Sequence, residues 1–174
     1  GVRTSIFDAN KRLLKKNGII IPESGTIKIS LLGNDKEICN TISVANVSGF
    51  DLSEFNSISQ SKFTHFLKKK PTLLSNIEDA FSINLYNKEN IVKEEKIIEL
   101  KVNKEGLCLG IIQWMKIQLY KDIKYENNPS EHLDSSSHWP TPIYLFDKAL
   151  SVKKGDVLKI KASLDTDNLW FFKE

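Results

Sequence analysis

The sequence has 174 residues, of which 40% are hydrophobic and 27% are charged, so it is long enough for one globular domain with a buried core. The net charge is only +3, and lysine supplies the excess because Arg3 and Arg12 are the only arginines. Surfaces that bind nucleic acids usually concentrate arginine with exposed aromatic residues. We therefore expect no nucleic-acid partner and interpret the run Lys68-Lys69-Lys70 as solvated surface.

Cys39 and Cys108 stand far apart without a second pair, which favours neither a disulfide scaffold nor a four-ligand zinc site. This cysteine usage fits a reducing compartment. No apolar run approaches the roughly 20 residues of a membrane-spanning helix, and the N-terminus lacks the pattern of a signal peptide. The sequence therefore predicts a soluble, cytoplasmic protein without a membrane partner.

The chain is expected to open with a helix over residues 4–17. Thr4 or Ser5 can cap its first turn, apolar residues recur on one face, and Gly18 follows its last residue. The next run, Ile19-Ile20-Ile21-Pro22, predicts a short buried strand that proline closes.

Alternation of period two then predicts half-buried strands, because successive side chains of a strand point to opposite faces. The alternating apolar triplets are Ile27, Ile29 and Leu31; Phe81, Ile83 and Leu85; and Ile98, Leu100 and Val102. Over residues 107–119 both faces are largely apolar, which predicts the central strand. We expect Leu109, Ile111 and Met115 on one face of it and Cys108, Ile112 and Trp114 on the other.

Further strands are expected at residues 143–146 and 169–172, and a hairpin from residues 150–152 through 153–156 to Val157 and Ile160. Residues 53–70 interrupt the strand pattern. Phe55 with Ile58, and Phe63 with Phe66 and Leu67, stand at helical spacings there. The fold class predicted is mainly β: an antiparallel β-barrel or sandwich with an N-terminal helix and a short, partly helical insertion.

No constellation of catalytic residues is evident in the sequence. Glycines occur singly, so no glycine-rich strand-to-helix turn is available for a nucleotide or a methyl donor. His65, His132 and His138 lack the spacing of zinc ligands, and no serine lies in a Gly-x-Ser-x-Gly motif. We expect no cofactor and no metal in this chain.

The loop that contains Ser137-His138-Trp139-Pro140 is the candidate recognition site. An indole face can hold a cation such as a guanidinium, and the neighbouring imidazole can hydrogen-bond a carboxylate. The alternative is that Trp139 fills the end of the barrel while His138 bonds nearby backbone, since aromatic residues more often serve packing. Spacing alone leaves both interpretations open.

The order of segments resembles the protein arginine methyltransferase family. The resemblance rests on the helix that ends in Lys15-Lys16-Asn17-Gly18, the segment Gly49-Phe50-Asp51-Leu52-Ser53, the long strand with Trp114, Ser137-His138-Trp139, and residues 150–156. It implies that residues 1–18 are the last helix of a Rossmann-like donor-binding domain. Residues 19–174 would then be the β-barrel substrate-side domain, with residues 53–70 as a dimerisation arm.

The resemblance also implies roles for single residues. Ser137-His138-Trp139 stands for the family's Thr-His-Trp loop, so His138 would orient an acidic group of the N-terminal domain, and Trp139 with Ser137 would border the substrate arginine. S-adenosylmethionine would bind the absent N-terminal domain, the substrate would be a protein or peptide arginine, and the barrel would form a homodimer. A fragment of this kind would not catalyse. The alternative function is a stand-alone β-barrel or sandwich module that binds a peptide or another ligand.

Overall fold

The computed structural model of the chain describes residues 2–87, 93–131, 139–166 and 168–174. Its helical elements in chain order are α1 (Val2–Arg12), α2 (Lys36–Ile42) and the 3-10 helix η1 (Ser53–Ile58). Its strands are β1 (Ser24–Gly33), β2 (Asn46–Val47), β3 (Phe50–Asp51), β4 (Lys62–His65), β5 (Glu78–Asn84), β6 (Glu94–Lys101), β7 (Gly106–Tyr120), β8 (Ile123–Glu126), β9 (Thr141–Val152), β10 (Val157–Leu164) and β11 (Leu169–Lys173).

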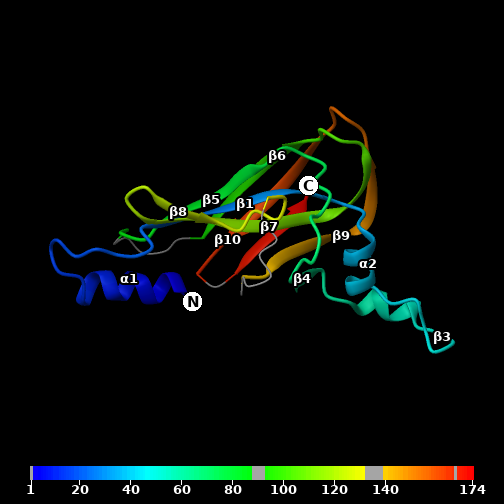
Figure 1. Ribbon diagram of the computed structural model, residues 1–174, viewed down its shortest axis with the longest axis horizontal. Helices are drawn as coiled ribbons and strands as arrows, with labels where there is room; N and C mark the ends of the chain where they lie inside the picture. The colour runs from blue at the N-terminus through cyan, green and yellow to red at the C-terminus, as the bar shows by residue number, and fades with distance from the viewer. Residues whose placement is uncertain (1, 88–92, 132–138, 167) are drawn as a thin grey trace.

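Two antiparallel sheets enclose the main core (Figure 1). The larger sheet has the order β4-β9-β7-β1-β5, with β8 paired to β7, and the smaller has the order β11-β10-β6. Ile29 and Phe81 of the first sheet belong to the same buried cluster as Leu100 and Ile160 of the second. The prediction of a mainly β, antiparallel fold with an N-terminal helix is confirmed. Among the described helices, none is long and apolar enough to cross a membrane.

The strand expected at the centre is β7, which lies between β9 and β1 in the larger sheet. Its two faces cover different clusters: Ile111 packs in the main core, whereas Ile112 and Trp114 pack with Leu32 and Ile38 beneath α2. Because each face buries apolar side chains, the strand reads as apolar on both sides.

Two residues of β7 face the opposite way from the prediction. Leu109 was expected beside Ile111 but lines a pocket with Cys39 and Ile42 of α2. Cys108 was expected beside Ile112 but packs in the main core with Ile111, because the register of β7 against β9 shifts between Cys108 and Gly110. Such a bulge reverses the alternation locally. Burial raises the pKa of the Cys108 thiol to about 11, so the thiol is protonated at neutral pH and behaves as an apolar core residue.

Gly110 marks the point of closest approach between β7 and β9. A Cβ atom built on it would lie within 3.0 Å of backbone atoms of Tyr144 and Leu145, the Tyr144 carbonyl oxygen being nearest. Backbone atoms cannot move aside as the end of a side chain can. Only glycine therefore allows the two backbones to meet at the bulge.

The variant Gly110→Ala should lower the free energy of unfolding by about 3 kcal/mol or more, because the added methyl forces β7 and β9 apart. Gly25→Ala is the matched control, since its Cβ would lie 3.6 Å from Ile117 and Met115 side-chain atoms, an ordinary contact. We expect the control to change stability by less than about 0.5 kcal/mol. Urea unfolding of both variants measures the difference, and equal stabilities would contradict this role of Gly110.

The connection between β9 and β10 differs from the predicted hairpin. Strand β9 pairs with β7 and β4, whereas β10 pairs with β6 and β11, so residues 153–156 carry the chain from one sheet to the other. The turn has Gly155 at φ +99° and a hydrogen bond from the Lys153 amide to the Asp156 carboxylate at 2.8 Å. The turn signal was correct, but local sequence does not tell which strands pair on either side of it.

The N-terminal segment differs from the prediction in two ways. Helix α1 ends at Arg12 rather than Asn17, and residues 19–22 form no strand. Ile19 and Ile21 are 56% and 64% exposed, so three consecutive isoleucines do not indicate burial here. The helix is attached to the barrel by the buried side-chain amide of Asn10, which donates to the Leu85 carbonyl oxygen.

The segment between β1 and β4 projects from the end of the larger sheet opposite to α1 (Figure 1). Its 3-10 helix confirms the helical spacing of Phe55 and Ile58, but Phe63 lies in β4, paired with Ile143 of β9, and not on a helix. Helix α2, which the pattern did not predict, is only seven residues long and is capped by the Asp35 carboxylate. We call residues 36–60 the projection.

Candidate functional site

Trp139 lies two residues before the start of β9 and is 43% exposed. Ser137 and His138 lie outside the described residues, so their predicted roles stay predictions. The indole of Trp139 meets the ring of Tyr125 edge to face, with the centroids 5.6 Å apart and the planes at 88°. A large part of the Trp139 side chain thus remains accessible to a ligand rather than filling the core.

The partner ring belongs to β8, which folds back along β7 as a hairpin. Tyr125 is opposite Ile117 in this ladder, and Lys121 takes a positive φ of 50° in the turn. The Gln118 side-chain amide donates to the Lys121 carbonyl oxygen across the turn. The β7–β8 hairpin therefore carries the ring that contacts Trp139 of the recognition loop.

Two residues at the end of β8 anchor this hairpin to the core. The indole N–H of the fully buried Trp114 donates to the Glu126 carboxylate at 2.9 Å. The Met115 amide donates to Oδ1 of Asn127 at 2.9 Å, and the Asn127 amide donates to the Met115 carbonyl oxygen at 3.2 Å. The sequence offered one signal for this, since a buried tryptophan needs an acceptor for its N–H.

The start of the loop is also fixed by hydrogen bonds. Asn128 is 4% exposed, and its Oδ1 accepts from the Ser130 amide at 3.0 Å and from the Ser130 hydroxyl at 2.8 Å. Past the undescribed residues, Thr141 is buried and begins β9 opposite His65 of β4. Both ends of the loop are thereby held on the same sheet.

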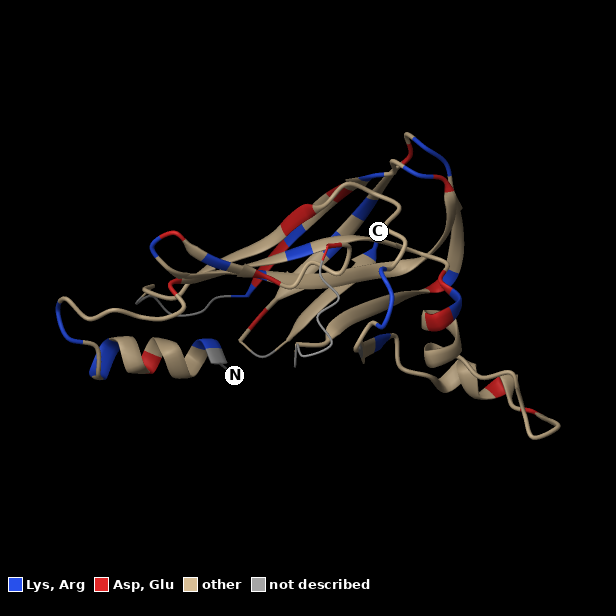
Figure 2. Cartoon of the chain, viewed as in Figure 1, with Lys and Arg blue, Asp and Glu red and all other residues tan. Residues whose placement is uncertain are grey.

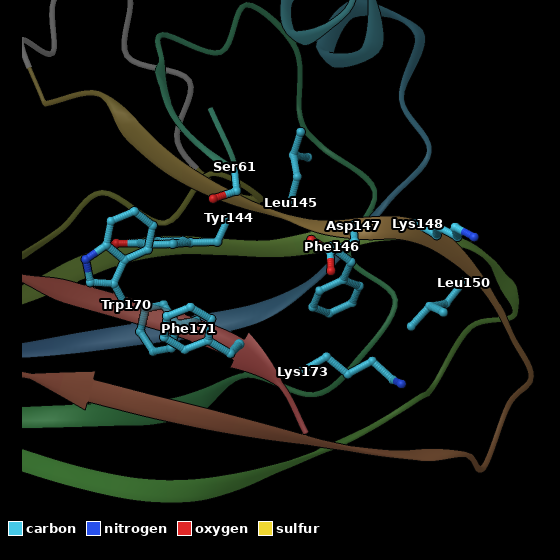
Figure 3. Close-up of a pocket in the computed structure, with 11 residues that line it drawn as sticks. Ser61, Tyr144, Leu145, Phe146, Asp147, Lys148, Leu150, Trp170, Phe171 and Lys173 are labelled. Atoms are coloured by element: carbon cyan, nitrogen blue, oxygen red, sulfur yellow. The ribbon is translucent and has the colours of Figure 1, made fainter. Parts of the chain in front are cut away.

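A cavity of about 480 Å³ lies between β9 and β11, where the two sheets meet (Figure 3). Its lining includes Phe146, Asp147, Leu150, Trp170 and Lys173. Its lining is mixed, with aromatic and aliphatic side chains beside the charged Asp147, Lys148 and Lys173. Among the described residues, no group of three His, Cys, Asp or Glu side chains could hold a metal ion.

The sheets are joined at one end of this cavity by Tyr144. Its hydroxyl, which has one hydrogen to donate, lies 2.8 Å from Oε1 of Gln113 and 3.2 Å from the Leu169 carbonyl oxygen. The Lys62 ammonium lies 5.0 Å from the centre of the Tyr144 ring and 5.3 Å from that of Trp170, and it also donates to the Leu169 carbonyl oxygen. Burial raises the pKa of Tyr144 and lowers the pKa of Lys62.

The described residues do not fit a methyl-donor site. The strand ladders are all antiparallel, whereas a nucleotide-like donor usually binds over a glycine-rich turn between a parallel strand and a helix. The described glycines with positive φ, Gly49, Gly106 and Gly155, lie singly in separate turns. The described residues instead present a half-exposed aromatic pair, Tyr125 and Trp139, beside the larger sheet.

Comparison with known proteins gives the following relationships. Residues 28–171 match the family described as the arginine methyltransferase oligomerization subdomain. The chain is 23% identical over 181 residues to protein arginine N-methyltransferase 2 of Xenopus tropicalis, covering 95% of this chain and 41% of the relative. It is 24% identical over 165 residues to an arginine N(omega)-methyltransferase of Streptomyces achromogenes subsp. streptozoticus, covering 92% of this chain and 44% of the relative.

A solved structure has the same fold. The chain aligns with one from the Trypanosoma brucei PRMT1 enzyme-prozyme heterotetrameric complex with AdoHcy, with a TM-score of 0.73 and 12% sequence identity, over 99% of this chain and 64% of that chain. The chain spans less than half the length of both of these curated relatives.

Proposed function

We propose, from the premise that this chain belongs to the arginine methyltransferase family, that it is the substrate-side barrel of a protein arginine N-methyltransferase. The match over residues 28–171 carries this proposal. In it, S-adenosylmethionine binds a separate donor domain, because the described residues here do not fit one. The free cysteines Cys39 and Cys108 suit the reducing cytoplasm in which we place the protein.

The barrel contributes one wall of the channel for the arginine substrate. Trp139 provides an aromatic surface against which a guanidinium can stack, and its exposure of 43% leaves room for that contact. His138 orients an acidic group of the donor domain, and Ser137 supplies a hydroxyl at the border of the channel. The proposed contribution of these residues to catalysis is positioning of the substrate.

The role of the loop is tested in the full-length protein with a peptide substrate. Trp139→Ala and His138→Ala should each lower kcat/KM by about tenfold or more, as loss of substrate positioning commonly does. Phe172→Ala is the matched control, because Phe172 is an aromatic residue of similar exposure, 51%, on the smaller sheet. Near-normal turnover in both loop variants, or an equal loss in the control, would remove the loop from the site.

We also propose that the projection mediates a homodimer. Residues 38–61 contain no lysine or arginine and only two acidic residues, Asp51 and Glu54, and Figure 2 shows the outer part of the projection mostly in tan with acidic positions in red. Its exposed apolar side chains are Val44, Val47, Phe50, Phe55 and Ile58. Exposed apolar side chains gathered on one segment are a common mark of a protein–protein interface, and a twofold interface uses one self-complementary patch.

The projection is rigid enough to act as a docking element. The Val44 amide donates to Oδ1 of Asn56 at 2.9 Å, and the Asn56 side-chain amide donates back to the Val44 carbonyl oxygen at 2.7 Å. A third hydrogen bond, from the Leu52 amide to the Ala45 carbonyl oxygen, spans 2.7 Å. These bonds tie η1 to the segment after α2. The family description as an oligomerization subdomain supports the same proposal.

Phe55→Asp or Ile58→Asp should raise the dimer dissociation constant by at least about thirtyfold, because a charge at a buried interface anchor costs on the order of 2 kcal/mol or more. Sedimentation velocity measures the change. Val157→Asp is the control, since Val157 is 51% exposed on the smaller sheet. A monomeric wild-type protein, or a dimer that both projection variants leave intact, would contradict the proposal.

A further inference from the structure

We propose that Tyr125 is a positioning residue for Trp139, so that the hairpin of β7 and β8 sets the geometry of the arginine channel. This inference rests on the proposed function, because it gives Tyr125 a catalytic consequence only if Trp139 borders the substrate. Tyr125 touches neither donor nor reacting atoms in this account. Its proposed effect on the substrate is indirect, through the Trp139 ring that it contacts.

The contact between the two rings has the geometry that aromatic pairs prefer. The centroids are 5.6 Å apart and the planes meet at 88°, which brings the positive edge of one ring to the negative face of the other. A perpendicular contact fixes the tilt of the indole as well as its distance. Tilt matters because a guanidinium binds to the face of an aromatic ring and not to its edge.

Tyr125 can hold another residue because its own position is fixed. It is paired with Ile117 in the β7–β8 ladder. The next residue, Glu126, accepts a hydrogen bond from the buried indole of Trp114 at 2.9 Å, and Asn127 exchanges two hydrogen bonds with Met115. The Tyr125 ring is therefore attached to the central strand over consecutive residues.

Trp139 is tied to the hairpin by this ring contact. It follows the undescribed part of the loop and precedes Pro140, which has no amide hydrogen to donate. Thr141 is the first buried residue after it, in β9. The Tyr125 ring is thus a bridge from the exposed indole to the rigid hairpin. The sequence pattern did not indicate this, because residues 125 and 139 are joined only through the fold.

A spectroscopic experiment on this chain tests the contact itself. With 5-fluorotryptophan incorporated, the three tryptophans give three fluorine resonances, and Trp139→Phe identifies that of Trp139. Tyr125→Leu should shift the Trp139 resonance and leave those of Trp114 and Trp170 in place, while Tyr125→Phe, which keeps the ring, should leave all three unchanged. Tyr120→Leu is the matched control, since Tyr120 is half-buried in the same hairpin.

Kinetics of the full-length protein test the consequence. Tyr125→Leu should lower kcat/KM for a peptide substrate by about three- to tenfold, mainly through KM, because the indole is held less well before substrate binds. Tyr125→Phe should restore wild-type values. In a Trp139→Ala background, Tyr125→Leu should cause no further loss, because residues that act through one contact are not additive.

The outcomes separate this inference from the proposed function. An unshifted Trp139 resonance, or losses that multiply in the double variant, would overturn the role of Tyr125 while leaving that of Trp139. If Trp139→Ala and Tyr125→Leu both turn over normally although the resonance shifts, the proposed function of the loop fails, and the catalytic role of Tyr125 fails with it.

Discussion

The closure of the two sheets around one core depends on Tyr144. Its hydroxyl reaches Gln113 on β7 and the Leu169 carbonyl oxygen on β11, and its ring meets Phe171 edge to face at 5.0 Å. The Lys62 ammonium from β4 lies over the same ring. One side chain therefore connects strands of both sheets. A buried hydroxyl is tolerable only because its hydrogen bonds are made within the protein.

The central strand β7 connects this junction of the two sheets to the candidate site. Gly110 lets β7 approach β9 at Tyr144, and β7 then runs on to Trp114, whose indole holds Glu126 at the end of β8. Tyr125, the residue before Glu126, contacts the ring of Trp139. The exposed aromatic surface is thus supported by the central strand of the larger sheet, and this arrangement suits a residue whose proposed task is to orient a substrate.

Much of the fold was predictable from period and composition. The alternation at Ile27, Ile29 and Leu31, and the two apolar faces of β7, are local signals that the structure confirms. The isoleucines at residues 19–21, of which Ile19 and Ile21 are exposed, were misread, because an apolar run does not say which surface covers it. Helix α2 was missed, since seven residues are too few for a helical period to stand out. The partners of β9 and β10, and the bulge at Cys108, depend on pairing between distant segments.

The candidate site was predictable only in part. Trp139 was indicated by its place beside histidine and proline, and its accessible ring is consistent with a binding role. No comparable sequence pattern indicated Tyr125, Glu126 or Asn127. Their importance comes from the hairpin, which places them against Trp139, Trp114 and Met115, respectively. The family relationship is to the arginine methyltransferase oligomerization subdomain, and the substrate-side role of the described residues is the proposal built on it.

Calorimetric titration with S-adenosylmethionine tests most directly the proposal that this chain forms the substrate side while a separate domain binds the methyl donor. The full-length protein should bind the donor saturably. This chain alone, shown to be folded by its thermal transition, should give no saturable heat. Saturable binding of S-adenosylmethionine by this chain would contradict the assignment of the donor site to a separate domain.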